Sequence, residues 1–185
     1  NVDITAPTVT IESPADNFLS TDNSVTVTWN GSDIGSEVDR YEVSWEGGSP
    51  VTLLPGVSSY TFTSLSDGSH VLTVVVYDKV GLSSTDTVAI LIDAQPPSLT
   101  ITSPAQGGYL GTADVMVTWS GSDAGTGIAY YWVSMEGLPA INTTGTSYTF
   151  NDLADGTYTV LVSAYDQLGN YQDETVTFTV DTVAP

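Results

Sequence analysis

The sequence predicts an all-β protein made of two tandem antiparallel β-sandwich domains arranged end to end. Apolar and polar residues alternate with a period of two, and no 3.6-residue pattern lasts long enough for a helix. The chain also repeats itself: Ser-Pro-Ala at 13–15 returns at 103–105, and Val-Thr-Trp at 27–29 returns at 117–119. A repeat of about 90 residues holds one small two-layer hydrophobic core.

Each repeat divides into short strands that Gly, Asp, Asn and Ser separate at turn-like spacing. In the first repeat we expect strands near residues 8–12, 24–30, 40–46, 59–62, 70–77 and 86–92. In the second repeat we expect them near residues 98–102, 114–120, 129–136, 147–150, 157–165 and 174–180. A short additional strand, near 51–54 and 139–142, would bring each repeat to seven, the pattern of a two-sheet sandwich.

Alternation assigns one face of each long strand to the core. The inward residues of the first repeat are Val25, Val27, Trp29, Tyr41, Val43, Trp45, Leu72, Val74 and Val76. Those of the second repeat are Val115, Val117, Trp119, Tyr131, Val133, Met135, Val160, Val162 and Ala164.

The domain boundary follows from a recurring linker. Asp-x-x-x-Pro at 3–7 returns at 93–97 and begins a third time at 181–185, so the end of the chain resembles the start of a further linker. We therefore expect domain 1 over residues 1–92 and domain 2 over residues 93–185. Proline fixes φ and removes a donor, so the linkers should be stiff, extended and limited in their bending.

Several motifs occur in both repeats: Val-Thr-Trp-x-Gly-Ser-Asp, Tyr-x-Val-Ser, Ser-Tyr-Thr-Phe and Tyr-Asp-x-x-Gly. Together they resemble the tandem immunoglobulin-like (fibronectin-III-like) repeats of bacterial and archaeal cell-surface and extracellular proteins. The resemblance implies an immunoglobulin-like sandwich, an extracellular or cell-surface location, and a role in adhesin stalks, filaments or the spacers of secreted hydrolases. The second repeat ends its last motif with the usual Gly-Asn at 169–170, whereas the first has Leu82 in place of the Asn.

Composition excludes several classes of partner. The chain has 22 acidic residues, its only Lys and Arg are Lys79 and Arg40, and its formal net charge is −20. Nucleic acid and anionic membranes need a basic surface, so neither is an expected partner. The chain has no cysteine, which excludes disulfides, and no apolar run long enough for direct membrane insertion. The acidity itself has two open explanations, bound calcium or a high-salt habitat.

A calcium site is expected at one end of each sandwich. In this kind of sandwich the loop after the second strand and the loop before the last strand lie at the end where the chain enters. Carboxylate oxygens without nitrogen or sulfur ligands suit Ca²⁺, which is the one cofactor expected. The alternative is that each Asp only hydrogen-bonds its own turn. The candidate metal ligands are Asp3, Asp33 and Asp78 in the first repeat and Asp93, Asp123 and Asp166 in the second.

The sequence does not predict an enzyme. His70 is the only histidine, and no nucleophile-elbow motif is present. A catalytic carboxylate pair would need a cleft, which a small sandwich rarely has. Asp67-Gly68 and Asp155-Gly156 are expected to be turn residues.

Two further surface features are candidates for contact or modification. Asn30 and Asn142 begin sequons, which are glycosylation acceptors in an extracellular protein of an N-glycosylating organism. Trp132 and Tyr130 should point away from the core, where they could contact a glycan or a neighbouring subunit, or pack on an adjacent strand.

These observations predict a non-catalytic structural repeat of an extracellular filament or adhesin stalk, which provides reach and end-to-end assembly. Its partners would be neighbouring immunoglobulin-like repeats or identical subunits, and surface glycans. The alternative is a carbohydrate-binding or spacer module of a secreted hydrolase.

Overall fold

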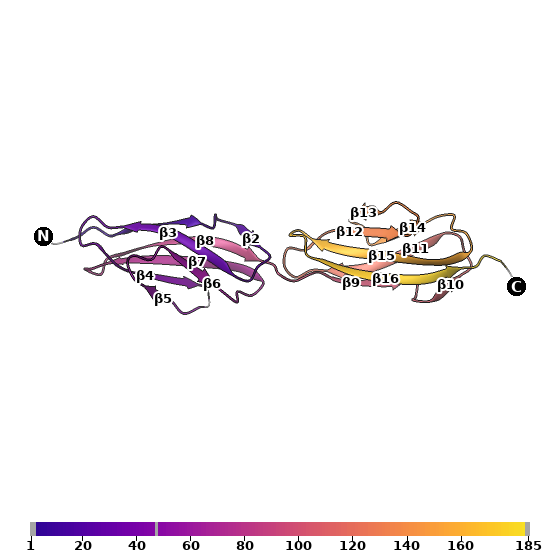
Figure 1. Ribbon diagram of the computed structural model, residues 1–185, viewed down its shortest axis with the longest axis horizontal. Helices are drawn as coiled ribbons and strands as arrows, with labels where there is room; N and C mark the ends of the chain where they lie inside the picture. The colour runs from indigo at the N-terminus through magenta and orange to yellow at the C-terminus, as the bar shows by residue number, and fades with distance from the viewer. Residues whose placement is uncertain (1–2, 47, 184–185) are drawn as a thin grey trace. The chain divides into compact units, whose positions relative to one another are not determined.

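The computed structural model describes residues 3–46 and 48–183, and the chain divides into two compact units, Asn1–Ala94 and Gln95–Pro185 (Figure 1). Every regular element in the described residues is a β-strand. No helix in this part of the chain has the length and apolarity needed to cross a bilayer. The all-β prediction is therefore confirmed.

Domain 1 is a sandwich of a three-stranded sheet, in the order β1-β3-β6, and a five-stranded sheet, in the order β2-β8-β7-β4-β5 (Figure 1). Its strands are β1 (Thr8–Ser13), β2 (Phe18–Ser20), β3 (Val25–Ser32), β4 (Val38–Trp45), β5 (Val51–Leu53), β6 (Ser59–Phe62), β7 (Gly68–Asp78) and β8 (Ser83–Ile92).

Domain 2 repeats this topology, with sheets ordered β9-β11-β14 and β10-β16-β15-β12-β13 (Figure 1). Its strands are β9 (Ser98–Ser103), β10 (Gly108–Leu110), β11 (Val115–Ser122), β12 (Ile128–Met135), β13 (Ile141–Thr143), β14 (Ser147–Phe150), β15 (Gly156–Asp166) and β16 (Tyr171–Val180). The prediction of two tandem sandwiches is confirmed.

Each domain has one strand more than the sequence predicted. β2 and β10 are edge strands that pair in parallel with β8 and β16, so the larger sheets are not wholly antiparallel. Each strand has only three residues, and none of them is fully buried, although Leu110 of β10 packs against the core. Period-two alternation therefore could not reveal them. Each is entered through a left-handed residue, Asn17 at φ 61° and Gly107 at φ 72°.

The cores contain the residues that alternation assigned to them. Val27, Val43 and Leu72 are fully buried in domain 1, as are Val117 and Val133 in domain 2. Trp45 is less buried than the other predicted core residues: it is partly buried and packs against the core. Full burial of such side chains contributes about 1.5–3 kcal/mol each, which makes these strands the stable centre of both domains.

The Trp-x-Gly-Ser-Asp motif has a steric reason. The rings of Trp29 and Tyr41 lie 5.5 Å apart, and Tyr41 crosses the backbone of Gly31 so closely that a Cβ on that residue would collide with the ring. Gly121 meets Tyr131 in the same way in domain 2. The glycine therefore lets the tyrosine reach the tryptophan at the centre of each core.

Carboxylates take main-chain hydrogen bonds at the strand irregularities. β1 shifts its register on β3 between Ile11 and Ser13, and the freed Ile11 N–H donates to Asp86 Oδ2 at 2.7 Å. In domain 2 the Ile101 N–H donates to Glu174 Oε2 at 2.8 Å. An acidic side chain on one sheet thus satisfies a main-chain donor on the other.

The aspartates of the two Asp-Gly pairs also hold the chain that leaves each domain. Asp67 Oδ1 accepts from the Ala94 N–H at 2.9 Å, and Asp155 Oδ1 accepts from the Thr182 N–H at 2.9 Å. The Thr182 hydroxyl adds a bond of 2.8 Å to the same oxygen, and these bonds lower the pKa of Asp155. Each exit segment is therefore anchored to its own domain.

We expect Gly31→Ala to destabilise domain 1, and Gly121→Ala domain 2, by about 1–3 kcal/mol each, because overpacking forces the tyrosine to move. Urea unfolding monitored by tryptophan fluorescence measures this. Gly56→Ala is the matched control, since nothing lies near a Cβ at that position. Equal stability of Gly31→Ala and Gly56→Ala proteins would contradict the steric argument.

Candidate metal centre

Three carboxylates meet at one corner of domain 1. Asp3 precedes β1, Asp33 follows β3, and Asp78 ends β7. One ligand oxygen from each lies within 4.8 Å of the others. Oxygens on opposite sides of a calcium ion, each about 2.4 Å from it, are about 4.8 Å apart, so this spacing fits one shared ion.

The loop after β3 is built around the Asp33 carboxylate. Its Oδ2 accepts from the N–H groups of Gly35 at 3.0 Å and Glu37 at 2.8 Å. Glu37 has a left-handed φ of 71°, so the chain turns back toward the carboxylate. The second oxygen, Asp33 Oδ1, is buried and accepts no hydrogen bond among the described residues.

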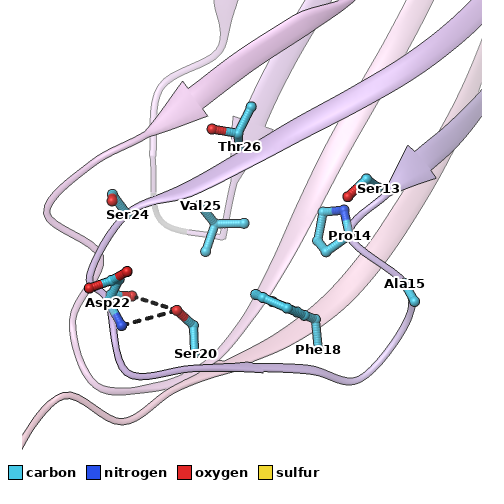
Figure 2. A pocket seen from close by; sticks show the side chains of 9 residues that line it. All are labelled: Ser13, Pro14, Ala15, Phe18, Ser20, Asp22, Ser24, Val25 and Thr26. Atoms are coloured by element: carbon cyan, nitrogen blue, oxygen red, sulfur yellow. Dashed lines mark hydrogen bonds between the residues drawn. The ribbon is translucent and has the colours of Figure 1, made fainter.

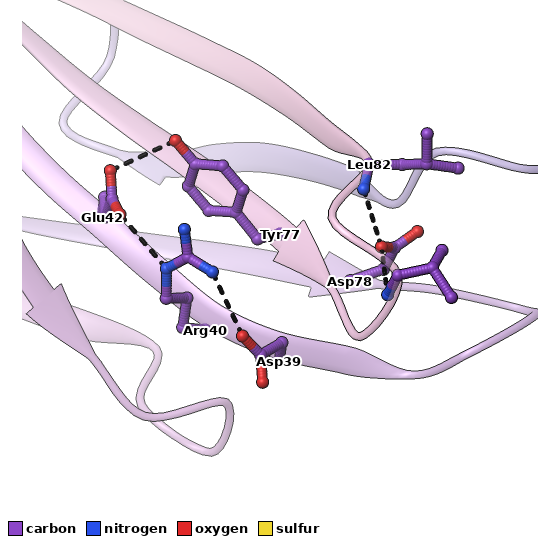
Figure 3. Close-up of polar contacts among 7 residues, drawn as sticks. Asp39, Arg40, Glu42, Tyr77, Asp78 and Leu82 are labelled. Atoms are coloured by element: carbon purple, nitrogen blue, oxygen red, sulfur yellow. Dashed lines mark hydrogen bonds and ion pairs between the residues drawn. The ribbon is translucent and has the colours of Figure 1, made fainter.

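The loop between β7 and β8 holds Asp78 in the same manner. Asp78 is 1% exposed, and its Oδ1 accepts from the N–H groups of Val80 at 2.9 Å and Leu82 at 2.8 Å (Figure 3). Its Oδ2 is buried and accepts no hydrogen bond within the described part of the chain. Burying an unpaired carboxylate oxygen costs desolvation free energy, which a cation bound to Asp78 Oδ2 would offset.

Asp3 is fixed by the two segments beside it. Its carboxylate accepts from the Thr5 N–H at 3.0 Å and the Ser36 N–H at 2.7 Å. These bonds, that from Thr5 first, hold the pKa of Asp3 below its ordinary value. Gly35 lies directly against the carboxyl group, and a Cβ there would collide with it. The glycine therefore leaves the space that Asp3 fills.

The chemistry of this donor set fits a hard divalent cation. All the ligand atoms are carboxylate oxygens, which Ca²⁺ and Mg²⁺ prefer and which zinc and copper sites use less. Two buried oxygens without donors give a second indication that is independent of the clustering. A cation would offset both the repulsion among three anions and the loss of hydration at these two atoms.

Domain 2 satisfies the equivalent loop differently. Asp166 Oδ1 accepts from the N–H groups of Leu168 at 2.8 Å and Asn170 at 2.9 Å. Its Oδ2 accepts from the Asn170 side-chain amide at 2.7 Å. Leu82 occupies the corresponding place in domain 1, and its side chain has no hydrogen-bond donor. The replacement noted in the sequence thus explains why Asp78 Oδ2 is left without a partner.

The other predicted ligands lie in equivalent positions. Asp123 Oδ1 accepts from the N–H groups of Gly125 at 3.0 Å and Gly127 at 2.7 Å, so it organises its loop as Asp33 does. Asp93 follows β8, is 1% exposed, and its N–H donates to the Ser20 carbonyl at 2.9 Å. Asp93 belongs to the first compact unit, whereas Asp123 and Asp166 belong to the second.

Of the remaining candidates, Asn142, Trp132 and Tyr130 lie near one another on β12 and β13, whereas Asn30 lies on β3 of domain 1. Asn30 and Asn142 are both exposed, as a glycosylation acceptor must be. Trp132 is 45% exposed, and Tyr130 is partly buried and stacks on Tyr165 with ring centroids 4.8 Å apart. These positions agree with the outward orientation expected from alternation.

His70 and, in one pocket of domain 1, the Ser20 hydroxyl both bond to main-chain groups. His70 is 6% exposed, packs edge-on to Trp45, and bonds the Ser66 carbonyl through Nε2 at 2.7 Å. Figure 2 shows a pocket of about 340 Å³ beside β2, in which the only charged side chain is Asp22. The Ser20 hydroxyl in that pocket bonds the main chain of Asp22, so it is not paired with a base.

Gly35 belongs to the site although no local sequence motif marks it. Its role depends on the approach of Asp3 from a distant segment, which no local pattern shows. The available signal was the recurrence of glycine at the same place in the second repeat, at Gly125.

Each repeat matches a family model of bacterial immunoglobulin-type domains. The family model described as "Bacterial Ig domain" matches residues 7–74, and the one described as "Bacterial Ig-like domain" matches residues 112–182. The chain is a tandem pair of immunoglobulin-like domains.

The chain is similar to three curated proteins and to a solved structure. Chitinase A1 of Niallia circulans is 31% identical over 191 residues, which cover 99% of this chain and 27% of the relative. Halomucin of Haloquadratum walsbyi is 35% identical over 104 residues (53% and 1%), and Amylopullulanase of Thermoanaerobacterium saccharolyticum is 28% identical over 165 residues (86% and 12%). The chain thus spans at most about a quarter of the length of these curated proteins. The fibronectin(III)-like modules of Clostridium thermocellum CbhA are 18% identical, with 94% of each chain covered and a TM-score of 0.44.

We expect Leu82→Asn to stabilise metal-free domain 1 by about 1–3 kcal/mol, because a new amide would donate to the buried Asp78 Oδ2. Asn170→Leu is the reciprocal change and should destabilise domain 2 by a similar amount. Calorimetry with a chelator present measures both. If neither variant shifts the unfolding transition of its own domain, the side chain at positions 82 and 170 does not determine whether the Oδ2 atoms of Asp78 and Asp166 are satisfied.

Proposed function

We propose that these immunoglobulin-like domains are a non-catalytic structural repeat of an extracellular protein, where they provide reach between its other parts. The supporting observation is that the same closed sandwich, with the same aspartate-organised loops, is built twice in one chain. A structural array gains length with every added domain, whereas a catalytic site gains nothing from this kind of repetition. Adhesin stalks and filaments are arrays of this type.

A second setting, the spacer of a secreted hydrolase, is favoured by the similarity to Chitinase A1 and Amylopullulanase. Both names denote enzymes that act on polysaccharides, and this chain matches only part of each. In that setting the two domains would separate a catalytic domain from another module of the same polypeptide. The structural role of the domains is the same in both settings.

A calcium ion held by Asp3, Asp33 and Asp78 would serve this role. It would tie the segment that enters domain 1 to two loops of the same domain and so resist opening of that end. In domain 2 the Asp166 Oδ2 already accepts from the Asn170 amide, so the proposal is confined to the set in domain 1. Neutralising this set would also reduce the self-repulsion of a chain with net charge −20.

The calcium proposal is tested by calorimetry in millimolar Ca²⁺ and in chelator, at equal ionic strength. At about a hundredfold excess over Kd, an ion that binds only the folded state stabilises by about 2.7 kcal/mol. We expect the transition of domain 1 to rise, and Asp78→Asn or Asp33→Asn to abolish the rise. Asp22→Asn, a carboxylate outside the cluster, is the control and should keep it. If monovalent salt raises the transition temperature and Ca²⁺ does not, the acidic side chains need only general charge screening and the calcium proposal is wrong.

The structural role is tested by pulling single molecules that carry the chain between handles. Two independent sandwiches of about 90 residues should give two unfolding events, each releasing about 300 Å of chain. Added Ca²⁺ should raise the unfolding force of domain 1 in the unmodified chain and leave it unchanged in Asp78→Asn. Extension without resolvable unfolding events would contradict a mechanical role.

A further inference from the structure

Domain 2 carries a groove of about 280 Å³ on the outer face of its larger sheet. Strands β12, β15 and β16 form its floor and walls. Of the residues that line it, Trp132 lies on β12, Ser163 and Tyr165 lie on the central β15, and Tyr171 and Asp173 lie on β16. The groove thus combines aromatic rings with hydroxyl and carboxylate groups.

The strand register places these side chains in two neighbouring rows. Trp132 is opposite Ser163, which is opposite Asp173. Two positions along the strands, Tyr130 is opposite Tyr165, which is opposite Tyr171. Residues two apart on a strand share a face, so both rows point outward. A row of tyrosines therefore borders a row of mixed aromatic and polar groups.

The tyrosine row is a rigid wall. The rings of Tyr130 and Tyr165 are nearly parallel, 4.8 Å apart, and those of Tyr165 and Tyr171 are 5.3 Å apart. Tyr171 at its outer end is 55% exposed, and Trp132 across the groove is 45% exposed. Desolvation is the largest cause that raises the pKa of Tyr165, and the neighbouring Tyr130, Asp173 and Tyr171 raise it further. The Tyr165 hydroxyl therefore keeps its proton and can donate a hydrogen bond. Such rings offer contact area with little loss of side-chain entropy.

The polar groups converge on the same space. Ser163 is buried beneath the row, and the Asp173 carboxylate is exposed at its end. On the other side of Trp132, β13 places the exposed amide of Asn142 directly opposite it. A ligand that contacts the indole would therefore find a carboxylate and an amide within the same row.

At the corresponding positions of domain 1 the side chains bond to one another. Arg40, Glu42 and Tyr77 occupy the positions of Tyr130, Trp132 and Tyr165 (Figure 3). The guanidinium of Arg40 lies 3.9 Å over the Tyr77 ring and donates to Glu42 at 3.1 Å. The Tyr77 hydroxyl donates to Glu42 at 3.2 Å. The open groove of domain 2 is therefore not a requirement of the fold.

We propose that this groove binds a neutral polysaccharide chain. A pyranose ring has apolar C–H faces, which pack on aromatic rings, and hydroxyl edges, which bond to carboxylate, amide and serine groups. The net charge of −20 and the exposed Asp173 oppose any anionic ligand. A basic ligand would find one carboxylate and a floor of serines, which is a weak ion-pairing site. This binding goes beyond the structural role and does not depend on calcium.

Affinity electrophoresis in native gels tests the proposal, with protein made in a host that adds no N-glycans. Hydroxyethyl cellulose and glycol chitin are the neutral probes, and carboxymethyl cellulose is the anionic match for the first. We expect at least one neutral polymer to retard the protein and carboxymethyl cellulose to leave it unretarded. Trp132→Ala and Tyr171→Ala should each weaken binding about tenfold, which corresponds to about 1.4 kcal/mol. Glu42→Ala, at the equivalent position of domain 1, is the control and should bind as the unmodified chain does.

The proposal is wrong if neither neutral polymer retards the protein. It is also wrong if calorimetry shows both groove variants folded and their retardation equals that of the unmodified chain. Sedimentation provides the remaining check: a dimer that dissociates on Trp132→Ala would assign the groove to a second copy of this chain.

Discussion

Hydrogen bonds from loop N–H groups to aspartate carboxylates are the interaction on which both sandwiches depend. Asp33, Asp78, Asp123 and Asp166 each accept two such bonds and thereby set the course of a loop. A carboxylate that organises a loop in this way brings its charge and its second oxygen to the same corner. In domain 1 the second oxygens of Asp33 and Asp78 are buried and accept no hydrogen bond among the described residues, which is the observation behind the calcium proposal.

The sequence predicted the fold because period-two burial and repetition both act over whole strands. It could not reveal β2 and β10, which are edge strands of three residues, too short for an alternating pattern to stand out. The clustering of Asp3 with two loop aspartates was predictable from the sandwich topology. The consequence of Leu82 was not, because the sequence shows a missing amide without showing which oxygen the amide serves. The outward position of Trp132 was predictable, whereas the tyrosine wall opposite it needed the cross-strand register.

The two domains show how one fold carries different surfaces. Their cores use the same tryptophan, tyrosine and glycine contact, so packing constrains those positions strongly. The outer face of the larger sheet is free of that constraint. Domain 1 places the ion pair of Arg40 and Glu42 where domain 2 has Tyr130 and Trp132, and domain 2 has a groove beside Trp132. The outer faces of the two larger sheets therefore differ although the cores are alike.

The central claim is that the aspartate corner of domain 1 holds a calcium ion. Titration calorimetry of Ca²⁺ into the chelator-treated chain, at constant ionic strength, measures binding directly. The account predicts saturable binding, with one ion lost from the stoichiometry in Asp78→Asn and none lost in Asp22→Asn. No saturable heat, or a stoichiometry that Asp78→Asn leaves unchanged, would contradict it.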